Sequence, residues 1–166
     1  MGVSIYGMVI EKTNKTIDSD NLAETFVHEN FKRSLLDSEV LEYDIEDDSA
    51  SIDGPSIAYS SYNYFRNELA IAALGIDFGD VLGIVKGLDD DEDYPEAIYH
   101  IINFSDCEGA IGPKAVKELS KFLTDNYTKM KEYFVKQDEE FFLSVFESLY
   151  SCINETAEND GFLIFG

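Results

Sequence analysis

The segment Ser105-Asp106-Cys107-Glu108-Gly109 holds the densest group of reactive side chains in the sequence. A thiol flanked by two carboxylates is a weak nucleophile, because neighbouring negative charge raises its pKa and disfavours the thiolate. We therefore interpret Cys107 as a structural thiol packed beneath a loop. Asp106 and Glu108 are then caps for loop amides or for the helix predicted to begin at Pro113. On this interpretation the segment contains no catalytic residue.

Arg66 is the only cationic residue between Arg33 and Lys86. In so acidic a chain we expect it to serve one specific anion, and its planar fork can clamp the carboxylate of Asp106 or Glu108. A closed pair of this kind would hold the fold together. An open pocket is the alternative, in which Arg66 orients an anionic ligand and one of the carboxylates acts as a general base or a metal ligand.

Other catalytic and metal-binding patterns are absent from the sequence. It contains no GxGxxG, P-loop, HExxH or GxSxG motif. His28 and His100 stand alone and do not combine with the two cysteines, Cys107 and Cys152, at zinc-ligand spacing. The acidic run 89–93 lacks the central glycine and alternating ligands of an EF-hand loop, so we interpret it as solvated charge. We expect no cofactor and no metal site, and the sequence leans against an enzyme.

The charge of the chain narrows the class of partner. Its 166 residues include 34 Asp and Glu against 12 Lys and Arg, a formal charge of −22. Such a surface repels phosphate backbones and anionic lipid, so we expect neither direct nucleic-acid binding nor membrane binding. A basic protein is the favoured partner, because complementary fields speed encounter. Solubility alone would also account for the acidity.

Two features of the sequence bear on location. Two cysteines cannot build a disulfide framework, and no charged-then-apolar leader precedes the first strand-like run. The longest apolar runs are far shorter than the ~20 residues of a membrane span. A reducing cytoplasm is the compartment that fits these features best.

Hydrophobic patterning predicts one α+β domain over residues 1–166. We expect a small mixed or antiparallel sheet that includes both terminal strands, at 3–10 and 162–165, packed by three to four helices. The helices are predicted at 20–36, 60–74, 113–135 and 138–157. Gly75 suits a helix stop, Pro113 a first helical position and Asp138 an N-cap.

Three segments have less definite predictions. Residues 37–55 are acidic and irregular, with an alternation near 41–48 that is typical of an exposed strand. Residues 76–94 are predicted to form an acidic loop or an insertion. The run 97–104 is either a buried strand or a short helix, because eight apolar residues do not distinguish the two.

Two motifs give a family resemblance. Residues 60–70, SSYNYFRNELA, are followed by NFSDCEG at 103–109. This pair resembles a group of small, mostly uncharacterised bacterial and phage proteins with SYxxFR and SDC(D/E)G motifs, and is similar to one class of polymorphic-toxin immunity proteins. The resemblance covers roughly 56–120 and the opening strand. Its signature positions here are Tyr62, Phe65, Arg66, Ser105, Asp106, Cys107, Glu108 and Gly109, while Phe104 stands where many members have His.

The sequence therefore leads to one main hypothesis and two alternatives. The resemblance implies a non-enzymatic, immunity-like protein of a bacterium or phage that neutralises a basic toxin or defence protein, and the charge argument favours the same class. An enzyme or small-ligand receptor with a pocket at Arg66 and the 105–109 loop is one alternative. The other is an acidic mimic of nucleic acid, which requires the carboxylates of 42–48 and 89–93 to align along one face.

Overall fold

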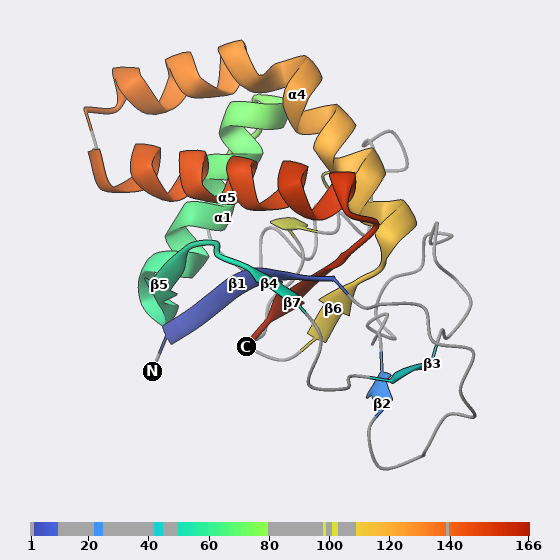
Figure 1. The fold of residues 1–166 in the computed structure, drawn as a ribbon. Coiled ribbons are helices and arrows are strands. Elements are labelled where there is room, and N and C mark those ends of the chain that lie inside the picture. The colour runs from blue at the N-terminus through green and yellow to red at the C-terminus, as the bar shows by residue number, and fades with distance from the viewer. Residues whose placement is uncertain are drawn as a thin grey trace.

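We describe the fold from a computed structural model. The residues that it describes are 2–9, 22–24, 42–44, 50–79, 98, 101–102, 109–138 and 140–166. They form an α+β domain with an antiparallel sheet and three long helices, as the sequence predicts (Figure 1). The sheet contains strands from both ends of the described chain, which is the expected arrangement.

The first strand and the last strand are neighbours in this sheet. Strand β1 (Gly2–Val9) pairs antiparallel with β7 (Phe162–Phe165), and β7 pairs in turn with β6 (Gly109–Ile111). The other edge of β1 is shared by β5 (Ser56–Ala58) and β4 (Ala50–Ile52). The order is thus β4-β1-β7-β6, with β5 also on β1. Residues 53–55, which include Gly54 and Pro55, separate β4 from β5.

Three helices pack beside the sheet: α1 (Tyr59–Leu74), α4 (Pro113–Lys136) and α5 (Glu140–Glu158). Figure 1 shows α5 lying over β1 and β7, with α4 running alongside α5 and α1 behind it. Val3 and Ile5 of β1 are buried, whereas Ser4 between them is exposed, because alternate side chains of a strand point to opposite faces. One face of the sheet therefore contributes to a shared core.

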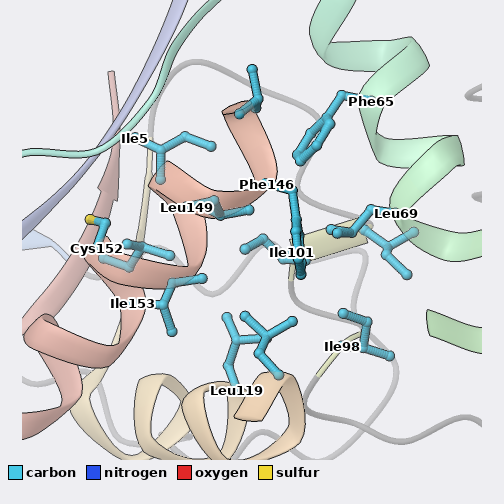
Figure 2. Packing of buried hydrophobic residues seen from close by; sticks show 14 of the residues in the cluster. Ile5, Phe65, Leu69, Ile98, Ile101, Leu119, Phe146, Leu149, Cys152 and Ile153 are labelled. Carbon is cyan, nitrogen blue, oxygen red and sulfur yellow. The ribbon is translucent and has the colours of Figure 1, made fainter. Parts of the chain in front are cut away.

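The core is formed where the helices meet one another and the sheet. Figure 2 shows Phe65 and Leu69 of α1 directed toward Phe146 and Leu149 of α5, with Leu119 of α4 below them in the view. All five side chains are at most 1% exposed. Burial of this kind contributes ~1.5–3 kcal/mol for each large apolar side chain. The positions at three- and four-residue spacing that predict the helices are the positions that fill the core.

Two glycines are required by the local geometry. A Cβ at Gly7 would collide with the Thr156 hydroxyl, so glycine there lets α5 lie close on β1. Gly75 ends α1 with φ of 74°, in the left-handed region that glycine adopts without strain, and its amide donates to the Ile71 carbonyl. The predicted helix stop at Gly75 is confirmed.

One helix prediction is wrong at the residues where it can be examined. Leu22–Glu24, inside the helix predicted at 20–36, form strand β2, which pairs antiparallel with β3 (Glu42–Asp44). Backbone pairing with a distant segment overrides a side-chain spacing that also fits a helix. The strand at 42–44 agrees with the alternation predicted near 41–48. The other residues of 20–36 lie outside those described.

Two smaller predictions can also be compared with the fold. The predicted N-cap at Asp138 is wrong: helix α5 begins at Glu140, and Asp138 lies in the preceding turn with a left-handed φ of 55°, whereas an N-cap residue has an extended backbone. In the run 97–104, Ile98, Ile101 and Ile102 are helical and buried, which favours the short helix over the strand at those positions. Of the predicted acidic loop 76–94, only 76–79 are described.

Candidate functional site

Arg66 lies in the middle of α1 and faces the interior. Its side chain is 1% exposed, and it is the largest side chain that the described residues bury completely. Helix α1 contains no Gly or Pro, and the buried Tyr62, Phe65 and Leu69 lie on the same face as Arg66 at three- and four-residue spacing. The helix thus carries a permanent cation into the core.

The guanidinium of Arg66 is held by polar groups from two parts of the chain. Nε donates a 2.6 Å hydrogen bond to the Ile102 carbonyl, and Nη1 donates to Oδ1 of Asn63 at 3.3 Å. Its central carbon lies 5.7 Å from the centre of the Tyr62 ring, at cation–π distance. Arg66 therefore connects α1 to the helical segment that immediately precedes residues 103–108.

Tyr62 and Phe65 belong to the aromatic core around Arg66. Both are 1% exposed. Burial raises the pKa of the Tyr62 phenol, and the Arg66 charge opposes this effect only in part. The Phe65 ring lies 6.0 Å from Phe134 of α4 and 5.9 Å from Phe142 of α5. Phe65 thus joins α1 to α4 and α5, and Tyr62 lies on the same buried face of α1.

The other half of the predicted site is described at one residue only. Gly109 begins β6, where its backbone is in register with Phe165 of β7. Ser105, Asp106, Cys107 and Glu108 lie outside the described residues, so the pairing of Arg66 with a carboxylate of this loop stays a prediction. Within the described part of the chain, no three His, Cys, Asp or Glu side chains gather as a metal ion would require.

Polar contacts near the end of α1 tie it to α4, and the sequence did not predict them. The Tyr133 hydroxyl donates a 2.6 Å hydrogen bond to Oε2 of Glu68. Nζ of Lys129 donates to the Ala73 carbonyl at 2.7 Å, where a cation complements the negative end of the helix dipole. The available signal was a tyrosine and a lysine four residues apart on α4, which is too common to indicate a contact.

A second polar cluster follows the end of α1. Oδ1 of Asp77 accepts hydrogen bonds from the Asn67 side-chain amide at 2.9 Å and from the Gly79 backbone amide at 2.8 Å. Oδ1 of Asn67 accepts from the Phe78 amide at 3.0 Å. These bonds favour the ionised carboxylate, so the pKa of Asp77 is lowered. The cluster fixes the chain direction as it leaves α1.

Cys152 is a buried thiol on α5. It is 1% exposed, and its Sγ donates to the Ile52 carbonyl at 3.7 Å. Burial raises the pKa of this thiol, which keeps it neutral and weakly reactive. Cys152 thus packs α5 against β4 and has the environment of a structural cysteine.

Comparisons with known proteins identify no family for this chain. No protein-family model, curated protein or solved structure matches the chain. Among the helices of the described residues, none has both the length and the apolar stretch that crossing a membrane demands.

Proposed function

We propose that this chain is a non-enzymatic acidic binding protein that neutralises a basic protein, as immunity proteins neutralise toxins in bacteria and phage. The uneven distribution of charge carries the proposal. Helix α4 contains six of the twelve Lys and Arg residues and three of the 34 carboxylates. The rest of the chain therefore has six cationic and 31 acidic residues, a formal charge of −25.

Three of the six lysines of α4 contact other elements of the molecule. Lys131 pairs with Glu147 of α5 at 2.7 Å, and Lys117 pairs with Asp160. Lys129 binds the end of α1, as described above. Exposed contacts of this kind contribute little to stability. They do direct these three lysines toward other parts of the same molecule. Residues 137–166 have seven carboxylates and no Lys or Arg, and Glu140, Glu155 and Glu158 are exposed on α5.

The burial of Arg66 favours a binding protein over a small-ligand receptor. A receptor for an anion needs the guanidinium to line an accessible pocket, and a side chain that is 1% exposed offers no such surface. Its Nε is also engaged by the Ile102 carbonyl. The motif resemblance to immunity proteins agrees with this choice.

Affinity purification from the native host tests the proposal. The tagged protein should retain a basic protein at low salt, and the association rate should fall steeply as salt rises, because screening shortens the reach of the opposing charges. A tagged variant with Glu140, Glu155 and Glu158 changed to Gln is the matched control and should retain less. Recovery of only acidic proteins or small molecules would refute the proposal.

A further inference from the structure

The end of the α4–α5 pair combines exposed apolar side chains with carboxylates. We name residues 132–138 and 140–142 the hairpin tip. Val135 is 55% exposed and Phe141 is 53% exposed, and they are two of the three exposed large hydrophobic side chains among the described residues. The third, Tyr64, lies on α1 and is 70% exposed. Figure 1 shows the tip at the left, beyond the strands of the sheet.

The charge of α4 falls from cationic to acidic toward the hairpin tip, and α5 is acidic along its whole length. Residues 113–131 contain five lysines and two carboxylates, whereas residues 132–142 contain four carboxylates and one lysine. Glu132, Asp138 and Glu140 are exposed beside Val135 and Phe141 in the chain. Apolar side chains with an acidic rim complement a basic surface that presents apolar groups. The opposite end of α4 carries the wrong charge for such a partner.

Phe141 is also supported from within. Its ring lies 5.5 Å from Phe142, which lies 5.9 Å from the buried Phe65, which lies 6.0 Å from Phe134. A row of aromatic rings thus leads from the core to the exposed side chain. An aromatic anchor held in place before binding loses little conformational entropy when a partner covers it, and such residues dominate binding energy at interfaces.

From these observations we infer that the hairpin tip is the surface that binds the partner, and that the partner contributes a basic amphipathic segment. Phe141 and Val135 pack against the apolar stripe of that segment, and the carboxylates of the tip face its Lys and Arg side chains. This inference rests on the proposed function, because it names the surface through which an acidic protein would hold a basic one.

A synthetic amphipathic helix of leucine and lysine is the probe. A peptide of the same composition in shuffled order, without an apolar stripe, is its control. Titration of the labelled protein, followed by backbone amide NMR shifts, should show the amphipathic peptide contacting the hairpin tip. Phe141→Ser should weaken binding about tenfold or more, whereas Tyr64→Ser, which removes a more exposed ring elsewhere, should change it less than about twofold. Glu140→Gln should weaken binding more than Glu158→Gln at the other end of α5.

Each outcome of these binding measurements either supports or overturns the assignment of the hairpin tip. Equal effects of Phe141→Ser and Tyr64→Ser would overturn the inference, as would shifts spread over α5 around Glu158 instead of the tip. Salt-sensitive binding of the peptide elsewhere on the surface would overturn this inference but not the proposed function. The proposed function fails separately, if the partner recovered from the host is acidic. Failure of the amphipathic peptide to bind even at low salt would also overturn the inference. Thermal midpoints equal to wild type show that each variant is folded. If Phe141→Ser is not folded, Val135→Ser takes its place as the test of the apolar side chains at the tip.

Discussion

Removal of the Arg66 guanidinium should destabilise the protein severely, and its contacts set the size of the effect. Arg66→Ala deletes the hydrogen bonds to the Ile102 carbonyl and Asn63 and leaves that carbonyl without its 2.6 Å donor. Loss of a buried partner costs ~1–3 kcal/mol. Two methylenes leave the core at ~0.8 kcal/mol each, before any cavity term. We expect a total of ~3–5 kcal/mol.

A urea titration measures this loss directly. With no Trp and ten Tyr residues, the chain is best followed by far-UV circular dichroism and tyrosine fluorescence. For a slope of ~2 kcal/mol per molar urea, the midpoint should fall by ~1.5–2.5 M. Arg66→Lys should recover little, because an ammonium lacks the planar fork. Tyr64→Ala, on the exposed face of the same helix, is the control and should change stability by less than ~1 kcal/mol.

The same titration tests whether Asp106 or Glu108 pairs with Arg66. Asp106→Asn and Glu108→Gln, each made alone and with Arg66→Met, form two double-mutant cycles. A coupling energy above ~1 kcal/mol in one cycle would assign the partner to that residue. Unchanged midpoints for Arg66→Ala and Arg66→Lys would refute the whole argument, because they would place the guanidinium in solvent.

The other predictions concern close packing, thiol reactivity and pH. Gly7→Ala should lower stability by ~1–3 kcal/mol through its collision with α5, and Gly75→Ala by ~1 kcal/mol through backbone strain alone; equal, negligible shifts of the urea midpoint would contradict both. In a Cys107→Ser background, Cys152 should react with a thiol reagent only after urea unfolds the protein, and fast labelling of the native state would be inconsistent with its burial. The lowered pKa of Asp77 contributes stability that is present above the unfolded-state value of 3.8 and is lost as pH falls through the folded-state value. Asp77→Asn should therefore flatten the acid limb of the stability profile, and an unchanged limb would show that Asp77 does not titrate differently in the folded state.

The sequence predicted the elements whose pattern is local. The helices at 60–74 and 113–135 and the strand at 162–165 were predictable because their apolar spacing, Pro113 and Gly75 act within a few residues. The strand β2 at Leu22–Glu24 was not, because three residues contain no period and their strand conformation depends on pairing with Glu42–Asp44. Strand β5 was missed for the same reason.

The candidate site, like the fold, was predictable from the sequence only in part. The isolation of Arg66 in an acidic chain predicted a specific anionic partner, Asp106 or Glu108, and that pairing stays a prediction. The acceptor found, the Ile102 carbonyl, could not be predicted, because every residue has the same backbone carbonyl and only the fold selects one. Contacts between helices, such as Tyr133 with Glu68, depend on the same three-dimensional placement.

The central position of β7 has a consequence for how the protein is made. Strand β7 lies between β1 and β6, so the middle of the sheet joins residues from opposite ends of the sequence. Gly166 exchanges two backbone hydrogen bonds with Ser4, which closes this join. Contacts of such long sequence separation slow folding, because the chain must close a large loop before they form. A nascent chain that has not yet exposed β7 lacks the centre of its sheet, so the sheet is completed only after residues 162–165 have emerged.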